Sequence, residues 1–428
     1  MFEQLNFRVN FNNADYSDLH FSEAEKTALR ELAKQVAEIA ARPVMQDRKN
    51  LWIRHNKLEV TRPLLLCDPE NGWNEIITEE SIVSRNSIAR HWEDHLRKQI
   101  FWGNEMMDDY VVEPYFNLPY VFKETQWTVA GSNRVQTIKK TAEQGKSYHI
   151  ETVLENYDQI KDIIKSKYLI DYDTTEKLLS MAHEIFDGIL EVRLNTVWFW
   201  SFGMTDDYVF LRGMEKLMYD FIDEPENVHK LMELLYRGTV EKLEFLENSG
   251  LNNDGTFVGS GGIGFTDELP AKNFTGHVRM KDMWGLGESQ VTVGISPDMF
   301  EEFIFPYQKK IMERFGLTCY GCCEPMDKRF DIVKSVPNLR RVSVSPWANK
   351  EIMAEKLGKN YVFSYKPSPS YLAVPELDEE EAREHIREVL DVTKNNHTEF
   401  IMKDNHTLCH NPDNIKNWVR IFREESER

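Results

Sequence analysis

The second half of the chain alternates short β-prone apolar runs with segments whose apolar residues recur at helical spacing. Strands that alternate with helices pair in parallel, because each helix returns the chain to the same end of the sheet. With this many units we expect an α/β fold, a closed (β/α)8 TIM barrel and not an open doubly wound sheet. The expected strands are 317–320, 340–345, 361–365 and 399–403, and the expected helices are 327–336, 348–357, 378–392 and 412–424.

The first half is less regular, although it contains two convincing buried strands. Residues 62–67 and 195–202 are apolar and β-prone, which is typical of strands covered on both faces. Residues 110–129 are β-branched and aromatic but contain Pro114 and Pro119, so we expect an irregular strand and loop there. Helical patterns are expected at 78–104, 158–190, 224–247 and 296–311.

The chain begins with a segment that we expect to be helical and to pack on the main domain. Ser22 followed by Glu25 forms a capping-box pattern, after which apolar residues recur on one face as far as Ala40. We therefore divide the chain into an N-terminal helical extension, residues 1–60, and a TIM-barrel catalytic domain, residues 61–428.

Composition and charge exclude several classes of protein. Hydrophobic residues make up 41% of the 428, and no apolar run reaches roughly 18 residues, so we expect a large core and no membrane span. The start of the chain lacks a signal-peptide pattern, and the five cysteines do not resemble a disulfide framework, which favours the cytoplasm. The formal charge of −19 argues against nucleic-acid binding and is compatible with a neutral or cationic ligand.

Four of the five cysteines fall in two segments, residues 317–325 and 404–410. Each segment follows an expected strand and precedes an expected helix, which is the junction where barrels build their active sites. Two strand ends that both offer thiolates indicate one shared metal ion, most plausibly zinc. The alternative is a set of ordinary buried thiols.

Large aromatic residues also gather near expected strand ends, and Trp73, Trp198 and Trp284 are candidates for substrate binding. Trp200 and Tyr320 belong to the same group, and together these rings suit a flat, apolar, methylated substrate. The alternative is plain packing at the top of a barrel, because large aromatics dominate protein cores in general.

A glycine-rich loop at residues 259–264 suggests a phosphate cradle at first sight. It lacks the Lys-Ser/Thr pair of a P-loop and the glycine spacing of a dinucleotide site. We therefore interpret it as a glycine-rich turn at a strand end.

Several segments resemble the uroporphyrinogen decarboxylase superfamily, and the likeness covers roughly residues 50–428. They are residues 219–228, residues 296–306 with the strand end at 317–323, and residues 343–347. The resemblance implies a TIM barrel and two classes of activity. True decarboxylases use no metal and have an early arginine-rich motif that this chain lacks. Zinc-dependent methyltransferases that work with corrinoid proteins have a His-x-Cys motif at one strand end and a further late cysteine.

This chain is similar to the second class but departs from it, because Tyr320 stands where the histidine of the His-x-Cys motif would be. Cys322 takes the cysteine position of that motif, and Cys409 matches the late cysteine. The resemblance leaves the other ligands open. Cys323 and Glu288 are the candidates that we prefer, and Glu324 and His406 are alternatives.

The resemblance implies a zinc-dependent methyltransferase that moves a methyl group from a small methylated substrate, such as an aryl methyl ether, to a corrinoid (cobalamin) carried by a partner protein. Glu288, Tyr320 and Glu75 are the expected catalytic residues, since an acid or a phenol near the metal could protonate the leaving oxygen. A metal-free decarboxylase, a methylcobalamin:thiol methyltransferase and a non-catalytic binding protein are the alternatives. A homodimer is left open.

Overall fold

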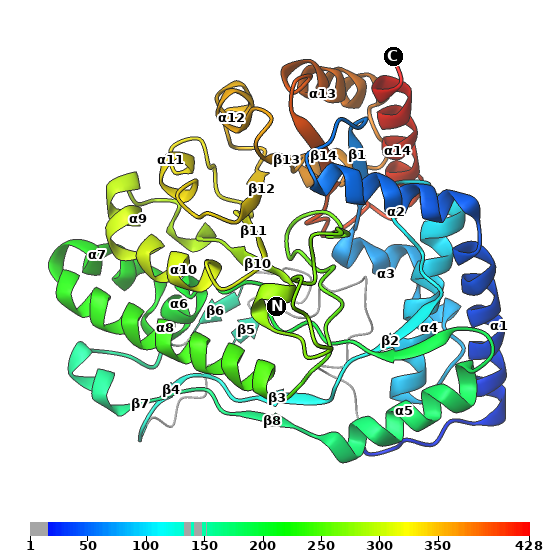
Figure 1. Cartoon of the computed structure of the whole chain (residues 1–428), viewed down its shortest axis with the longest axis horizontal. Helices are drawn as coiled ribbons and strands as arrows, with labels where there is room; N and C mark the ends of the chain where they lie inside the picture. The colour runs from blue at the N-terminus through cyan, green and yellow to red at the C-terminus, as the bar shows by residue number, and fades with distance from the viewer. Residues whose placement is uncertain (1–15, 132–137, 141–147, 151) are drawn as a thin grey trace.

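The computed structural model describes residues 16–131, 138–140, 148–150 and 152–428 (Figure 1). Its centre is a six-stranded parallel sheet in the order β1-β14-β13-β12-β11-β10. The strands are β1 (Leu64–Cys67), β10 (Trp284–Gly287), β11 (Leu317–Tyr320), β12 (Leu339–Val344), β13 (Val362–Tyr365) and β14 (His397–Met402). The helices between and after them are α9 (Pro297–Phe303), α10 (Phe305–Met312), α11 (Phe330–Val333), α12 (Lys350–Leu357), α13 (Glu379–Val392) and α14 (Asp413–Ser426). The alternation predicted for this half is therefore confirmed.

A second parallel pair lies between the two edges of this sheet, formed by β2 (Tyr115–Leu118) and β9 (Glu191–Leu194). Single backbone bonds join the pair to the sheet. The N–H of Asp109, before β2, donates to the carbonyl of Leu65 at 2.9 Å, and the N–H of Phe202, after β9, donates to Leu286 at 3.1 Å. In the described residues the hydrogen-bond ladders thus stop at six parallel strands and do not close a barrel.

The remaining elements are helices and short antiparallel pairs, β3 with β8, β4 with β7 and β5 with β6. These strands are β3 (Phe122–Glu124), β4 (Thr128–Val129), β5 (Ile138–Lys140), β6 (Tyr148–Ile150), β7 (Ile163–Ile164) and β8 (Tyr168–Ile170). The helices are α3 (Trp73–Ile76), α4 (Ser87–Phe101), α5 (Tyr172–Phe186), α6 (Thr205–Arg212), α7 (Met214–Asp223) and α8 (Pro225–Asn248). No helix in the described part is long and apolar enough to cross a bilayer.

Two expectations for the first half are wrong in detail. The strand predicted at 195–202 is found earlier, as β9, and the aromatic run itself is extended chain outside any ladder. The aromatic side chains of this run are typical of a strand. The run lies between β2 and β10, however, and makes one backbone hydrogen bond to each of them. The helix predicted at 158–190 begins only with α5, because β7 and β8 pair with β4 and β3 across the chain. Such pairing depends on a distant partner, which no local pattern reveals.

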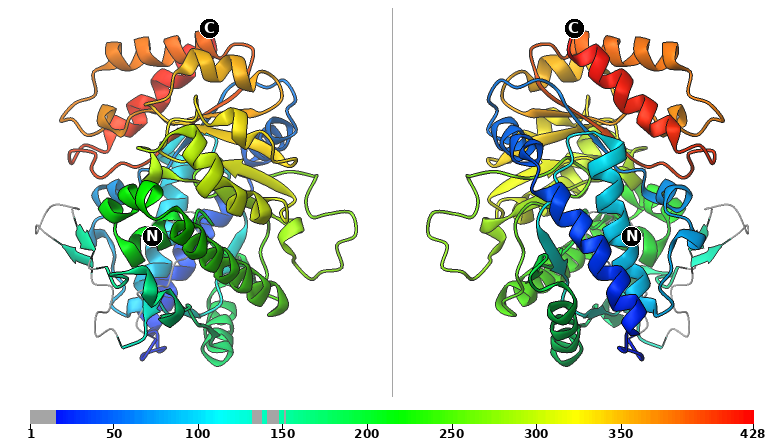
Figure 2. Two further views of the ribbon diagram at one scale, coloured as in Figure 1. Left: turned by 90° about the vertical axis from the view of Figure 1, so that its left-hand side faces the viewer. Right: turned by 90° about the vertical axis from the view of Figure 1, so that its right-hand side faces the viewer.

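The N-terminal segment contains two helices, α1 (Glu23–Ala40) and α2 (Pro43–Asn56), while residues 1–15 of the expected extension lie outside the described residues. The capping box at Ser22 and Glu25 is present, and α1 packs beside α4 (Figure 2). The end of α2 enters the main domain, where the Trp52 Nε1–H donates to the Asp109 carbonyl at 2.8 Å. The extension is thus continuous with the core.

A buried ion pair ties the amino half of the sheet to α2. Arg341 of β12 and His55 of α2 lie 3.0 Å and 3.2 Å from Oε2 of Glu399 on β14. The Ser364 hydroxyl and the Gly262 N–H donate to Oε1. Burial raises the pKa of Glu399, but the charges of Arg341 and His55 outweigh it and hold that pKa well below its usual range.

The glycine-rich loop packs against this ion pair. A Cβ on Gly262 would lie 2.6 Å from the Trp52 ring and 2.9 Å from Glu399 Oε2, so only glycine fits there. The loop bonds to α2 as well, since the Asn56 amide donates to the carbonyls of Ile263 and Phe265. The loop contains a turn at residues 259–260, as predicted, but among the described residues no strand directly precedes it, and it packs closely in the interior.

We predict that Glu399→Gln lowers the free energy of unfolding by about 3 kcal/mol, because it leaves the buried Arg341 charge without its counter-charge. Urea unfolding followed by tryptophan fluorescence measures this. Glu388→Gln is the matched control, since Glu388 pairs with Lys350 on the surface and should cost about 0.5 kcal/mol or less. Equal effects of the two substitutions would contradict the role given to the pair.

Candidate active site at the carboxyl ends of the strands

Backbone strain gathers in the loops at the carboxyl ends of the strands. Five non-glycine residues there have left-handed φ angles, Glu70 (48°), Met204 (62°), Asp404 (61°), Cys409 (55°) and His410 (57°). Each such residue costs roughly 1–3 kcal/mol and persists only where its surroundings enforce it. Strain of this kind concentrates at functional sites, which makes this face the first place to search for one.

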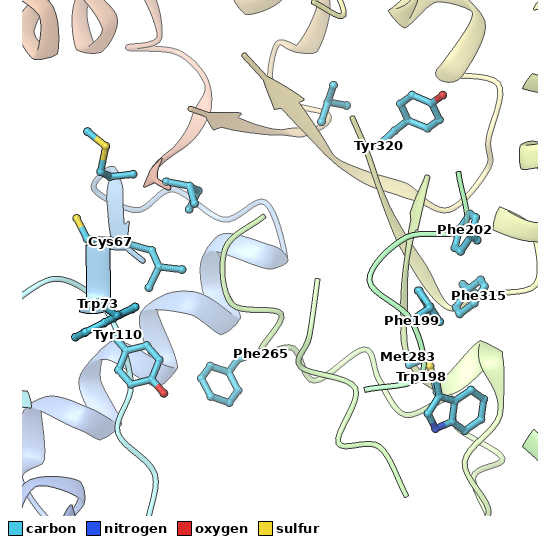
Figure 3. Close-up of a cluster of buried hydrophobic side chains, with 14 of the residues drawn as sticks. Cys67, Trp73, Tyr110, Trp198, Phe199, Phe202, Phe265, Met283, Phe315 and Tyr320 are labelled. Atoms are coloured by element: carbon cyan, nitrogen blue, oxygen red, sulfur yellow. The ribbon is translucent and has the colours of Figure 1, made fainter. Parts of the chain in front are cut away.

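A cavity of about 550 Å³ opens at this face beside the 199–206 segment. Its walls come from that segment, from α8 and from the β3–β4 and β7–β8 region. Seven of the lining side chains are aromatic, namely Phe122, Trp127, Tyr168, Phe199, Trp200, Phe202 and Phe210. Phe199 and Phe202 pack with Phe315, with ring centroids 5.3 Å from it in both cases, and form one side of the interior (Figure 3). The cavity is large enough for a single aromatic ring with substituents.

Glu288 follows β10 and places its carboxyl in the wall of this cavity. The residue is 1% exposed. The Ser201 hydroxyl donates to Oε1 at 3.0 Å and the Gln290 N–H donates to Oε2 at 2.9 Å. Burial, together with the nearby carboxyls of Asp206 and Glu324, raises the pKa of Glu288 well above its usual range. The raised pKa favours the neutral carboxyl, which is the form that can donate a proton.

Two further acids line the cavity at the start of α6. Burial, with Glu324 nearby, raises the pKa of Asp206 to about 6. Burial also raises the pKa of Asp207 to about 7, because the Lys242 charge lowers it less than burial raises it. The sequence interpretation missed both residues, although Asp206 and Asp207 directly follow the aromatic run and could have been found from that position.

The position of Glu288 is set by a chain of buried hydrogen bonds. The Gln308 side chain donates to the backbone carbonyls of Glu288 (2.7 Å) and Gly203 (2.9 Å), and the Tyr320 hydroxyl donates to Gln308 at 2.6 Å. A Cβ on Gly203 would lie 2.1 Å from Glu288 Oε1, so the close approach requires glycine. Tyr320, which was expected to be catalytic, is fully buried. Its hydrogen bond to Gln308 helps to position Glu288.

The paired cysteines, Cys322 and Cys323, lie just after β11, which is the neighbour of β10 in the sheet. Their sulfur atoms are 3.6 Å apart, and Cys323 Sγ lies 3.9 Å from Asp404 Oδ2. The Cys322 N–H donates to Glu324 Oε2 at 2.9 Å. In the pair, the hydrogen bond between the two sulfurs raises the pKa of Cys322, which is also buried, and lowers that of Cys323. Cys323 is the exposed member and is the thiol that ionises first.

Two buried lysines that the sequence interpretation missed lie near this pair, Lys366 one residue beyond β13 and Lys403 one residue beyond β14. Burial lowers the pKa of Lys366 to about 8. Burial opposes the charge of Lys403 too, but the neighbouring Cys322, Asp404 and Glu70 outweigh it and raise its pKa. Because side chains alternate along a strand, Lys366 lies on the same face as Ser364, and Lys403 on the same face as Ile401. The expected strand ends would have been enough to predict this placement.

The donor set only partly fits a zinc ion. Two sulfurs bound to one tetrahedral zinc at ~2.3 Å lie about 3.8 Å apart, close to the spacing of Cys322 and Cys323. The part of the chain that the structure describes holds no group of three or more His, Cys, Asp or Glu side chains placed to share a metal ion. Glu288 makes its bonds to Ser201 and Gln290 instead.

Glu75, another expected catalytic residue, holds the loop that carries Cys409. It accepts from the Thr407 hydroxyl at 2.6 Å and from the N–H groups of Leu408 (3.0 Å) and His410 (2.8 Å). Burial raises the pKa of Glu75, but these bonds outweigh it and the net effect is a lowered pKa. Its observed role is to stabilise a strained loop that contains the left-handed Cys409.

The three tryptophans expected to bind substrate lie in packed surroundings. Trp73 packs on Trp102 with centroids 4.5 Å apart, and its Nε1–H donates to Asp68. Trp284 lies under the Arg341 guanidinium at 5.0 Å. Trp198 is 2% exposed and sits beside Met283 (Figure 3). Trp200, from the same aromatic run as Trp198, is the indole of that run that lines the cavity.

We predict that Cys323 is the thiol most reactive toward iodoacetamide in chelator-treated protein at pH 8, because it is exposed and its pKa is lowered by Cys322. Mass spectrometry of the labelled peptides measures the rates. Cys323→Ser should remove the fast phase, whereas Cys67→Ser, a change at a fully buried thiol, should keep it. A fast phase that survives in Cys323→Ser would contradict this assignment.

Comparison with known proteins adds little to this picture. No protein-family model matches the chain, and no curated protein sequence matches it. Among solved structures the chain is similar to a methyltransferase from Methanosarcina mazei, with a TM-score of 0.47 and 10% sequence identity over 88% of this chain and 98% of that chain. A likeness of this size decides neither the closure of the barrel nor the chemistry.

Proposed function

We propose that this protein is an enzyme that removes the methyl group from a small aromatic methyl ether and passes it to a corrinoid on a partner protein. One observation carries the proposal, the buried carboxyl of Glu288, whose pKa is raised, in the wall of a cavity with seven aromatic side chains. The sequence resemblance to corrinoid-linked methyltransferases supports the same reaction class.

An ether oxygen is a poor leaving group unless it receives a proton as its bond to carbon breaks. In the proposed step the carbon–oxygen bond breaks, its electron pair stays on the oxygen, and the Glu288 carboxyl transfers its proton to that oxygen. A reduced corrinoid, when bound, would supply the nucleophile for the methyl carbon. The aromatic walls hold the ring and exclude water, which keeps Glu288 neutral until the transfer. Solvent then returns a proton to the Glu288 carboxylate.

The (β/α)8 barrel belongs to this proposal as well. Residues 109–118 and 191–202 would complete the six-stranded sheet as two irregular members. The single backbone bonds from Asp109 to Leu65 and from Phe202 to Leu286 support that closure. The five free cysteines favour the cytoplasm, where thiols stay reduced.

A second candidate function is decarboxylation of a carboxylated substrate. The buried ammonium groups of Lys366 and Lys403 are what such a substrate needs as counter-charges. Release of carbon dioxide with no methyl transfer would favour this candidate. Methyl transfer from methyl-cobalt to a thiol would instead indicate the reverse direction of corrinoid chemistry.

We predict that Glu288→Gln lowers kcat for demethylation by about a hundredfold and changes KM little, since glutamine keeps the shape but has no acidic proton to transfer. Formation of methyl-cobalt from a reduced corrinoid protein and a panel of methoxylated aromatics is followed by absorbance. Glu301→Gln, on the surface of α9, is the matched control and should retain wild-type kcat. Wild-type kcat in Glu288→Gln would refute the assigned role.

Zinc remains a prediction of the proposal. Protein purified without oxygen should contain about one zinc per chain, as a single mononuclear site requires. Cys322→Ala and Cys409→Ala should each lose most of it, while Cys67→Ala should not. Elemental analysis measures the content. Wild-type protein that is active and free of metal would refute a zinc site.

A further inference from the structure

We infer that the substrate of this cavity carries an ammonium group, which Asp206 and Asp207 bind while the aromatic walls hold its ring. The inference rests on the proposed function of the same cavity and narrows its substrate to methoxylated aromatic amines. It depends on the charges, the rings and the volume of the cavity together.

The cavity has more acids than cations. Lys242 Nζ lies 2.6 Å from Glu124 Oε2, and Lys123 faces Asp171 outside the cavity at 3.9 Å. Among the described residues no ion pair is formed by Asp206 or Asp207. Carboxyls that line a cavity without a counter-cation are stabilised when a ligand supplies one.

The rings of the cavity also favour a cation. Indole and phenyl faces carry negative charge density and attract ammonium groups within about 6 Å. The wall already contains one such contact, since Lys242 Nζ lies 5.8 Å from the Tyr168 ring centroid. Trp127, Phe199, Trp200 and Phe202 also line the cavity. A substrate carboxylate would instead meet Glu288, Asp206 and Asp207, while Lys242 is already paired with Glu124.

The chain as a whole supports the same sign of charge. Its net charge of −19 raises the local concentration of cations and speeds their approach. The described acids of the cavity do not converge as metal ligands do. An organic ammonium, which needs a negative environment and apolar contact at once, fits the cavity better than a metal ion does.

The acids of the cavity should make the binding of an ammonium group depend on pH. Asp206 and Asp207, whose pKa values burial raises to about 6 and about 7, face Lys242 on α8, Glu124 on β3, and Glu288 and Glu324 at the strand ends. The ionised carboxylate binds a cation more tightly than the neutral acid does. Ammonium affinity should therefore rise as the pH increases from 5 to 8, and binding near pH 7 should release protons.

The experiment is isothermal titration of the whole protein with three matched probes, methoxyphenethylamine, methoxyphenethyl alcohol and methoxyphenylacetate. At pH 8 the amine should bind at least about tenfold more tightly than the alcohol, as expected for a desolvated cation beside carboxylates and rings. Methoxyphenylacetate should bind more weakly than the alcohol. Equal or tighter binding of the alcohol or the acetate, or no binding of any probe, would overturn the inference.

Variants separate a specific site from general attraction. Asp207→Asn should reduce the preference for the amine over the alcohol to about twofold or less, and Asp206→Asn should reduce it as well. Asp223→Asn removes the same charge from an exposed position at the end of α7 and should keep the full preference. A full preference in both Asp206→Asn and Asp207→Asn would overturn the inference. Circular dichroism identifies any variant that fails to fold.

Binding and methyl transfer are measured separately, so the two proposals can fail separately. Selective amine binding without any methyl transfer would refute the proposed function and support the charge class of the ligand. Methyl transfer from neutral methoxylated aromatics, without a preference for amines in binding or in kcat/KM, would support the function and overturn the inference.

Discussion

The arrangement of this protein depends on how buried carboxylates are compensated. At the amino half of the sheet, Glu399 is balanced by Arg341 and His55 and by two further hydrogen bonds. That group joins β12, β13, β14, α2 and the glycine-rich loop, so it links parts of the chain far apart in sequence. A buried carboxylate with a counter-charge and several hydrogen-bond donors holds these elements in one arrangement, because any other arrangement would leave it unpaired.

At the carboxyl half of the same interior, the buried carboxyls are not compensated in this way. Glu288, Asp206 and Asp207 line a cavity where burial outweighs the available donors, so their pKa values rise. A protein gains no stability from acids placed in this way, and such sites are candidates for function on physical grounds. The contrast between Glu399 and Glu288 therefore separates the part of the interior that stabilises the fold from the part that can do chemistry.

Several residues expected to react are found to hold others in place. Tyr320 donates to Gln308, which in turn binds the backbone of Glu288, and Glu75 holds the loop of Cys409. Both residue types could serve in catalysis, and both lie at the strand ends where catalysis was expected. Burial and hydrogen-bond partners decide between the two roles, and neither can be seen in a linear pattern.

The parallel α/β architecture of the second half and the capped first helix could be predicted from the chain's residue pattern alone. Those features follow from apolar periodicity and capping, which act between residues a few positions apart. It also singled out Glu288 and the pair Cys322 and Cys323 as candidates, and their roles stay predictions. Only the tertiary structure placed Trp200 in the cavity and Trp198 in the core, and brought Asp206 beside Glu288. Burial and charge compensation depend on which distant segments meet, and that is decided when the chain packs.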